Sequence, residues 1–237
     1  MKFLLFFISV LSLAQSNPLR IKINTVTHSD SLISRRVYHI NYQIENRTNK
    51  EVQFFLNPAS LIAQSASSMT LFAVYKMHRN GVYDAMDGPF YEKMYPEQDQ
   101  IEDSKEYNSP KVQAIITKMT ATYKQIIDDY KKNGGKSTDD NWIIKNQMLL
   151  KTIVTLQPNE VKNFTIETSW RRNRYFKIAD SEYYLDEKDK FEIQLLLILN
   201  KSDRKNALTE KEWLNFKNNP NFLEGTVESN LMEISFN

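Results

Sequence analysis

Polar and apolar residues alternate over several short stretches of the chain, which is the pattern of strands with one buried face. In the clearest stretch, 37–44, four apolar or aromatic side chains share one face: Tyr38, Ile40, Tyr42 and Ile44. The stretch 161–170 alternates in the same way around Phe164 and Ile166. The stretch 191–199 is apolar on both faces in its second half, so we expect it at the centre of a sheet.

Turn residues divide these strands into two expected hairpins. A turn at 158–159 predicts that 148–156 pairs with 161–170, and a polar turn predicts that 37–44 pairs with 52–56. An isolated hairpin is not stable in water, so the rest of the chain must supply further strands. We expect these at 21–26, which is followed by turn residues, at 70–77 and at 226–236.

Helical periodicity is confined to three places. Residues 110–132 carry an apolar stripe with a spacing of about 3.6 residues, which predicts an amphipathic helix of about 34 Å. Ser109 suits its N-cap and Pro110 its first position, and two glycines follow its end. We expect this helix to pack on a face or an end of the sheet. A short helix is expected around Trp142, capped by Thr138 or Asp139, and a capping box at Thr209 predicts a third helix.

The N-terminus has the pattern of a secretory signal peptide. Lys2 precedes the apolar run 3–13, which is too short to span a bilayer, and small residues follow it. We therefore interpret 1–16 as a signal peptide, with a buried N-terminal element as the alternative. No other segment approaches the roughly 20 apolar residues of a spanning helix. The mature protein is expected to be exported, to the periplasm, the outer surface or the medium.

Composition narrows the classes of function. The 237 residues include no cysteine, which excludes disulfides, thiolate nucleophiles and Cys-ligated zinc. Lys and Arg number 31 against 29 Asp and Glu, so the formal charge of +2 gives no reason to expect nucleic acid as a partner. An exported chain without cysteine suits a bacterial envelope. We expect one domain over 17–237, with a loop and helical insertion at about 84–147.

About seven strands with hairpin turns and one helical insertion predict a mainly β protein, an antiparallel β-sandwich. The pattern Leu156-x-Pro158-x-Glu160, which follows a strand ending in Ile44-Glu-Asn46, resembles bacterial immunoglobulin-like sandwiches, namely the BsuPI-type proteinase-inhibitor domain and adhesion modules. In those modules the two motifs belong to neighbouring hairpins. The resemblance covers about half of the chain and implies an immunoglobulin-like fold, without an activity. The whole chain resembles exported proteins of the Bacteroidota kind.

Residues with chemical potential are sparse. The three histidines, His28, His39 and His78, lie on or beside expected strands without metal-ligand spacing, so we expect no metal site. A faint calcium-loop pattern at 84–88 lacks the alternating ligands, which favours a turn. The sequence contains no nucleophile elbow, P-loop or dinucleotide fingerprint. We therefore predict no catalytic residues and no cofactor.

Two irregular segments of opposite charge are the candidate binding residues. One is aromatic and acidic, the other is basic, and irregular segments are where binding residues concentrate. The residues singled out are Tyr91, Tyr95, Glu97, Asp99, Arg171, Arg172, Arg174 and Tyr175. Because Tyr and Arg supply much of the energy of interfaces, the segments indicate a protein-binding surface. The alternative is that they pair with each other or are simply solvated.

Three hypotheses of function follow. The first is an exported, non-catalytic binding or scaffold module for a protein of the cell envelope or exterior, including an inhibitor-like role. The second is a carbohydrate-binding module, which would need an exposed platform from Trp142, Trp170, Trp213 or the tyrosines. The third is a hydrolase with paired carboxylates facing each other across a cleft. The oligomeric state stays open.

Overall fold

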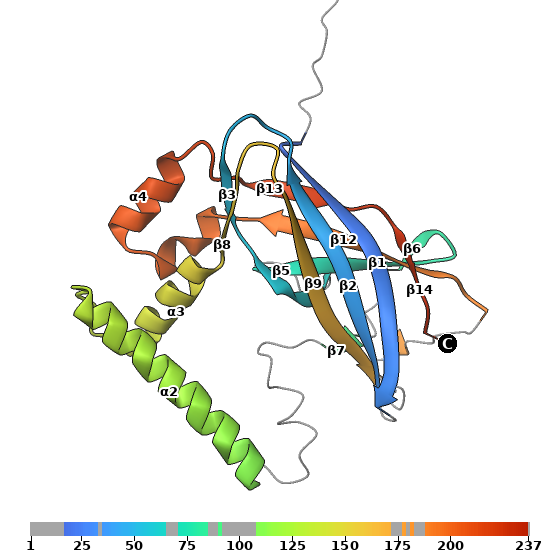
Figure 1. Cartoon of the computed structure of the whole chain (residues 1–237), viewed down its shortest axis with the longest axis horizontal. Helices are drawn as coiled ribbons and strands as arrows, with labels where there is room; N and C mark the ends of the chain where they lie inside the picture. The colour runs from blue at the N-terminus through green and yellow to red at the C-terminus, as the bar shows by residue number, and fades with distance from the viewer. Residues whose placement is uncertain are drawn as a thin grey trace, which may run out of the picture.

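The structure is a computed structural model, and it shows a mainly β protein with helices on one side (Figure 1). It describes residues 17–32, 35–64, 71–84, 90–91, 108–171, 177–178, 181–182 and 188–236. The expected signal peptide, 1–16, therefore lies outside the described residues.

The first sheet has four strands in the order β1, β2, β9, β7, all antiparallel. Their bounds are Leu19–Leu32, Arg35–Asn46, Val161–Arg171 and Phe90–Tyr91. The alternation predicted for 37–44 and 161–170 is confirmed, because Ile40 and Ile166 are paired across β2 and β9 and both are fully buried. The first strand was expected to end before the polar residues 28–31, but β1 continues through them to Leu32.

The second sheet is built around β12, Phe191–Leu199, which confirms its predicted central position. On one side β12 pairs with β5, Phe72–Arg79, and on the other with two short strands, β13 and β14. The remaining bounds are β4 Asn57–Ala63, β6 Val82–Asp84, β13 Gly225–Glu228 and β14 Met232–Ile234. β4 runs parallel to β5, so this sheet is mixed. A separate small ribbon joins β10, Lys177–Ile178, to β11, Ser181–Glu182.

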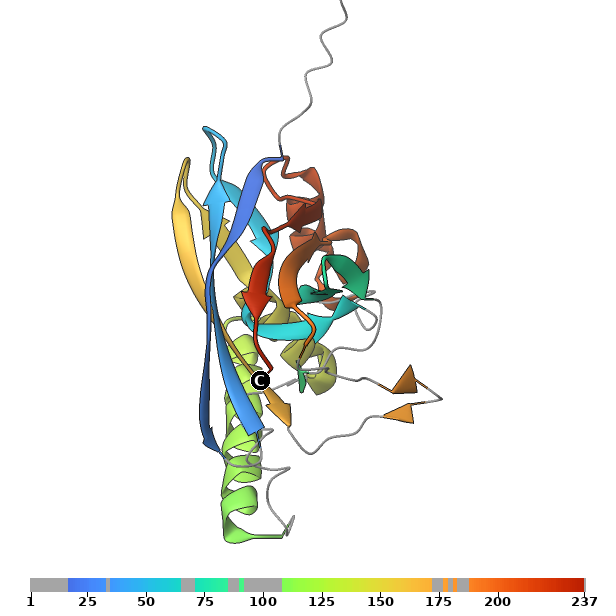
Figure 2. The same cartoon turned by 90° about the vertical axis from the view of Figure 1, so that its right-hand side faces the viewer.

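The two sheets face each other and share one hydrophobic core (Figure 2). Buried residues of the first sheet, such as Ile23 and Tyr42, belong to the same cluster as Ile193 and Leu195 of β12. Near the C-terminus, Phe236 is buried between the sheets among four aromatic rings, those of Tyr38, Phe90, Trp170 and Phe191. Apolar area removed from water at about 25 cal/mol per Å² makes this core the main source of stability.

Both hairpins expected from the sequence are wrong in their pairing. β2 pairs with β9, and β3, Val52–Phe55, pairs with β8, Ile153–Leu156. The two turns that were expected to close hairpins instead lie side by side at the top of Figure 1. One turn connects β2 to β3 and the other connects β8 to β9. The backbone N–H of Asn46 donates to the carbonyl of Glu160, and that of Asn159 donates to Thr48. The partners of each strand are therefore distant in sequence.

The helices α2, α3, η2 and α4 span Pro110–Lys132, Asp140–Lys151, Ser202–Ala207 and Glu210–Asn218. The predicted caps are confirmed, since Ser109 accepts from the N–H of Val112 and Thr209 forms its capping box with Glu212. α3, capped by Asp139, is longer than expected and takes up the residues 148–151 that had been assigned to a strand.

The helices form a second layer of packing beside β3 and β8. Among the described elements, α2 packs chiefly against α3, and Figure 1 shows it to the side of the sheets. The predicted docking of α2 on a sheet is therefore replaced by docking on another helix. A second apolar cluster of Phe55, Leu149, Leu208 and Phe222 connects α3, η2 and α4 to the sheets.

Candidate functional site

The candidate site lies at one end of the first sheet, where β7 and β9 meet. Tyr91 of β7 pairs with Ser169 of β9, two residues before Arg171, which in turn pairs with Arg35 of β2. The acidic aromatic segment and the basic segment therefore begin beside each other on neighbouring strands. The other predicted binding residues, Tyr95, Glu97, Asp99, Arg172, Arg174 and Tyr175, lie outside the described residues.

Two arginines at the start of β2, both of them buried, lie at the same end, which we call the arginine-rich end and define by Arg35, Arg36 and Arg171. Arg36 is buried and donates two hydrogen bonds to Asp30, from Nε to Oδ1 at 2.7 Å and from Nη2 to Oδ2 at 2.8 Å. Such a bidentate pair has a fixed geometry. The bonds with Asp30 raise the pKa of the Arg36 guanidinium above its ordinary value, so it stays charged.

The same arginine ties the C-terminal segment to the sheet. Arg36 Nη1 donates to the carbonyl of Ser235 at 3.3 Å, and the hydroxyl of Tyr38 donates to the same oxygen at 2.7 Å. The adjacent Phe236 is thereby held in its aromatic cage. The arginine-rich end consequently has a rigid base. The sequence interpretation missed Arg35 and Arg36, although they directly precede the clearest alternating stretch.

The tryptophans do not supply a carbohydrate platform. Trp142 donates from Nε1 to the carbonyl of Asn206 at 3.0 Å and lies edge-on to Tyr130. Trp170 packs on Phe236 in the main core, and Trp213 packs against the second apolar cluster. The three indoles therefore lie in three separate packing environments. No observation among the described residues favours the second hypothesis.

Two of the described carboxylates, those of Asp84 and Asp189, lie beside one arginine. Arg79 Nε lies 3.3 Å from Asp84 Oδ2 and 3.7 Å from Asp189 Oδ2. Asp189 also accepts from the side-chain amide of Asn80 at 2.8 Å. Within the described ranges, no three His, Asp or Glu side chains come together as a metal site would require.

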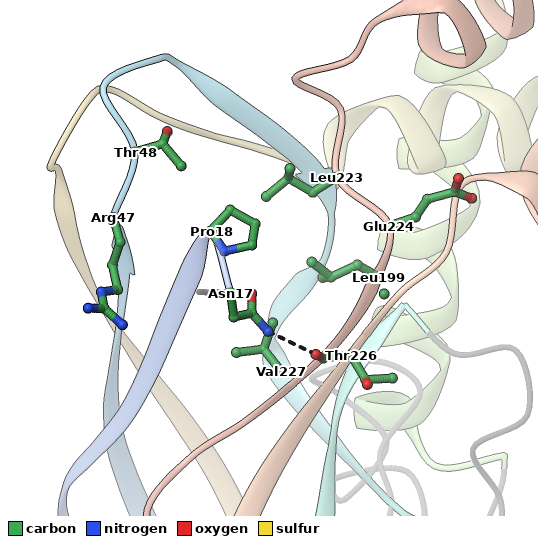
Figure 3. Close-up of a pocket in the computed structure, with 10 residues that line it drawn as sticks. Asn17, Pro18, Arg47, Thr48, Leu199, Leu223, Glu224, Thr226 and Val227 are labelled. Atoms are coloured by element: carbon green, nitrogen blue, oxygen red, sulfur yellow. Dashed lines mark hydrogen bonds between the residues drawn. The ribbon is translucent and has the colours of Figure 1, made fainter. Parts of the chain in front are cut away.

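A hollow of about 450 Å³ lies near the start of β1 and β13 (Figure 3). Its lining includes apolar side chains of Pro18, Leu199, Leu223 and Val227 and polar side chains of Asn17, Arg47, Thr48, Glu224 and Thr226. The volume is in the range of small-molecule sites. However, Asn17 already donates to the carbonyl of Thr226, so its amide is engaged within the fold.

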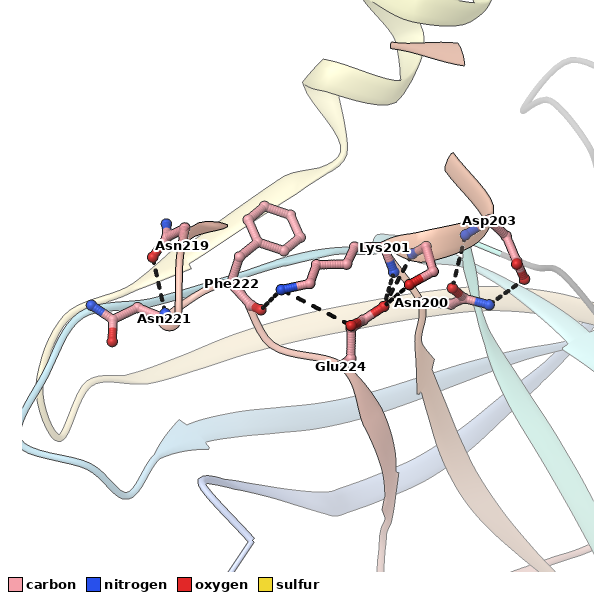
Figure 4. Close-up of polar contacts among 8 residues, drawn as sticks. Asn200, Lys201, Asp203, Asn219, Asn221, Phe222 and Glu224 are labelled. Carbon is pink, nitrogen blue, oxygen red and sulfur yellow. Dashed lines mark hydrogen bonds and ion pairs between the residues drawn. The ribbon is translucent and has the colours of Figure 1, made fainter. Parts of the chain in front are cut away.

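Glu224 at the rim of this hollow is also committed to the fold (Figure 4). Its Oε1 accepts from the backbone N–H groups of Lys201 and Ser202 and from the Ser202 hydroxyl at 2.8 Å. Lys201 Nζ donates to the carbonyl of Phe222 at 3.0 Å. These bonds tie the loop after β12 to the residues that directly precede β13. We therefore interpret this cluster as a structural clamp.

Comparisons with known proteins identify no relative from which a function could be inferred. No family model, curated protein or solved structure matches the chain. In the part of the chain that the structure describes, no helix is both long and apolar enough to cross a membrane. Of the places described above, the arginine-rich end is the one where Tyr91 and Arg171, two residues of the predicted binding segments, lie on neighbouring strands.

Proposed function

We propose that this protein is an exported, non-catalytic module that binds another protein through the two candidate segments that begin at the arginine-rich end of its first sheet. The observation that carries the proposal is the pairing of β7 with β9. This pairing brings the backbones of Tyr91 and Arg171, at which the two candidate segments begin, to one end of the sheet. The partner is a protein of the cell envelope or exterior.

The composition of the two candidate segments suits protein recognition. Tyrosine and arginine are enriched among the residues that dominate binding energy, because they combine large contact area with directional hydrogen bonds. A segment that follows the end of a strand can present such residues to a partner, while the strand fixes the point at which the segment begins. Here the end of the sheet is held in place by the Arg36–Asp30 ion pair and by the buried Phe236.

The proposed fold is an immunoglobulin-like sandwich, and two local features support it. The strand end at Asn46 and the turn at 157–160 are neighbours, as the resemblance implies. Asn159, inside the Leu156-x-Pro158-x-Glu160 pattern, has φ 59°, a left-handed conformation that asparagine adopts more readily than most residues. An inhibitor-like role, in which a segment at this end enters the cleft of a proteinase, falls within the proposal.

Affinity capture from an envelope extract of the source organism tests the proposal. The bait is the chain from Asn17 onward, and the test variant is Arg171→Ala/Arg172→Ala/Arg174→Ala. The control variant Lys111→Ala/Lys118→Ala/Lys124→Ala removes the same charge from exposed positions of α2. We expect the wild type and the control to retain the same partner and the arginine variant to lose it. Equal capture by all three would contradict the proposal.

Export is tested separately by N-terminal sequencing of the protein from cell fractions. We expect a product outside the cytoplasm that begins near Gln15 or Asn17. A cytoplasmic product that retains Met1 would contradict the export part of the proposal and leave the binding part to the capture experiment.

A further inference from the structure

The residues that follow β14 join the two sheets at the arginine-rich end. The carbonyl of Ser235 accepts hydrogen bonds from Arg36 Nη1 at 3.3 Å and from the Tyr38 hydroxyl at 2.7 Å. The next residue, Phe236, is buried, and its ring centroid lies between 5.3 and 5.9 Å from the centroids of four other rings. These four rings belong to β2, β7, β9 and β12. Phe236 therefore connects three strands of the first sheet to the central strand of the second.

Of the four strands, β7 depends most on contacts between side chains. Its two residues, Phe90 and Tyr91, pair with Trp170 and Ser169 of β9. In an antiparallel ladder only every second residue pair exchanges hydrogen bonds, so two residues provide one such pair. The ring of Phe90 is buried and lies edge-on to Tyr75 of β5, with the centroids 5.1 Å apart. This buried ring is consequently the main anchor of β7.

Phe236 contacts both members of a residue pair that joins β7 to β9. Its ring lies 5.9 Å from that of Phe90 and edge-on to that of Trp170 at 5.5 Å. On its other side it lies edge-on to Phe191 of β12 at 5.3 Å. Edge-on pairs at such distances are favourable beyond the burial of their area. Because hydrogen bonds fix the carbonyl of Ser235, the ring of Phe236 has a fixed place beside the pair.

We propose that Phe236 is a positioning residue: it acts as a latch that holds β7 on β9 and so fixes the place of Tyr91. The inference rests on the proposed function, because Tyr91 is where the first candidate binding segment begins. Without the latch, β7 leaves β9 for part of the time, while β2 and β9 stay paired over 35–45 and 161–171. A partner that binds only the latched state then has its apparent dissociation constant raised by the inverse of the latched fraction.

A latch differs measurably from a residue that only fills the core. Loss of a buried phenylalanine ring lowers the stability of the whole domain, and amide exchange that requires global unfolding then accelerates by the same factor in every strand. Loss of a latch opens β7 locally, and local opening leaves the protection of the other strands unchanged. The pattern of exchange along the chain therefore distinguishes the two roles.

Hydrogen exchange of the chain from Asn17 onward, measured by mass spectrometry on its peptides, tests the latch. The test variant is Phe236→Ala. The control Phe222→Ala removes the same ring from the second apolar cluster, where Phe222 is equally buried and contacts Phe55 and Phe216. Phe236→Leu, which keeps a large apolar side chain, serves as the test variant if Phe236→Ala does not fold. Circular dichroism verifies that each variant is folded.

In the test variant we expect peptides that contain Phe90 and Tyr91 to exchange about tenfold faster or more, while peptides from 36–46 keep the rate of the wild type. The control should leave the exchange at Phe90 and Tyr91 unchanged. Equal acceleration in all strands of the test variant would overturn the proposal. The same holds for equal acceleration at Phe90 and Tyr91 in the control, or for a wild type whose residues 90–91 exchange as fast as an unfolded chain.

A photoreactive phenylalanine at position 91 separates the latch from the proposed function. If the latch positions this residue for a partner, the yield of its adduct should fall in Phe236→Ala in step with the protection of β7. The lack of any adduct in the otherwise unchanged protein would contradict the proposed function, and the exchange experiment would still decide on the latch. An undiminished adduct from a variant whose β7 is released would overturn the positioning role of Phe236.

Discussion

The side-chain amide of Asn46 donates a hydrogen bond of 3.2 Å to the carbonyl of Leu156, 110 positions further along the chain. The same nitrogen lies 2.7 Å from the Lys50 carbonyl and 2.9 Å from that of Gln157. Its Oδ1 accepts from the backbone N–H and the hydroxyl of Thr48. One fully buried side chain thus joins the two turns at which β2 continues to β3 and β8 continues to β9.

Replacement of Asn46 should therefore destabilise the whole fold. In Asn46→Ala, several buried backbone groups lose their partners, and we expect a loss of roughly 2–4 kcal/mol in the free energy of unfolding. Asn46→Asp should be at least as harmful, because an oxygen would face the three carbonyls. Urea unfolding measures both. Asn49→Ala, in the same turn but exposed, should cost under about 0.5 kcal/mol, and equal losses at both positions would refute this role of Asn46.

The backbone conformation of Asn159 predicts which residues are tolerated at this position. Its φ of 59° is adopted readily by glycine, less readily by asparagine and with strain by β-branched residues. Asn159→Gly should change the free energy of unfolding by less than about 1 kcal/mol, while Asn159→Val should cost about 1–3 kcal/mol. The matched control is Asn163→Val, in the extended backbone of β9, which should be near neutral. Equal effects of valine at both positions in thermal unfolding would contradict the assignment.

Tyr42 predicts a loss of stability at high pH. Its hydroxyl is buried and donates to the carbonyl of Pro58 at 3.0 Å, and burial raises the pKa of its phenol well above the ordinary value. In the unfolded chain the phenol loses its proton near pH 10, whereas in the folded chain it stays neutral. Its contribution is therefore complete below about pH 10 and falls by about 1.4 kcal/mol per pH unit above it.

The comparison with Tyr42→Phe isolates this effect from the other tyrosines. At neutral pH the variant should be less stable by about 1 kcal/mol, because it lacks the hydrogen bond to Pro58. Above about pH 10 the difference should shrink and then reverse, since phenylalanine does not titrate. Urea unfolding of both proteins at neutral pH and above about pH 10 measures the difference in their free energies of unfolding. A difference that is independent of pH would show that Tyr42 ionises as easily in the folded protein as in the unfolded chain.

Local features of this fold could be predicted from the sequence because local interactions determine them. Ser109 caps α2, Thr209 and Glu212 form the capping box, and Asn80 adopts the positive φ that a tight turn requires. In each case a few adjacent residues satisfy their own backbone groups. The burial of alternate residues in β2 follows equally from a period of two.

Strand pairing could not be predicted in the same way. The residues 157–160 form a tight turn in either arrangement. Nothing in their local sequence tells whether the strands on the two sides of the turn pair with each other or each with a strand from elsewhere in the chain. The choice depends on Asn46, whose partners come from a distant turn. Likewise, the expected last strand is interrupted because the side chains of Ser229 and Asn230 bond to Leu195 and Ile23, in two other strands.

The candidate site was predicted as residue types and not as a place. Tyr91 and Arg171 were identified by composition, but their proximity results from the pairing of a two-residue strand, β7, with the end of β9. Arg36 was missed because its function depends on Asp30, on the opposite side of the β1–β2 connection, and on Ser235 near the C-terminus. Long-range contacts of this kind leave no periodic signal in the sequence.

Site-specific photo-cross-linking tests the proposed binding surface most directly. A photoreactive phenylalanine replaces Tyr91 in one variant and Asn163, at an exposed position of the same sheet, in the control. Both proteins are expressed in the source organism and irradiated, and adducts are identified by mass. We predict a specific adduct to one envelope protein from position 91 and none from position 163. The absence of an adduct at position 91, or the same adduct from both positions, would contradict the account.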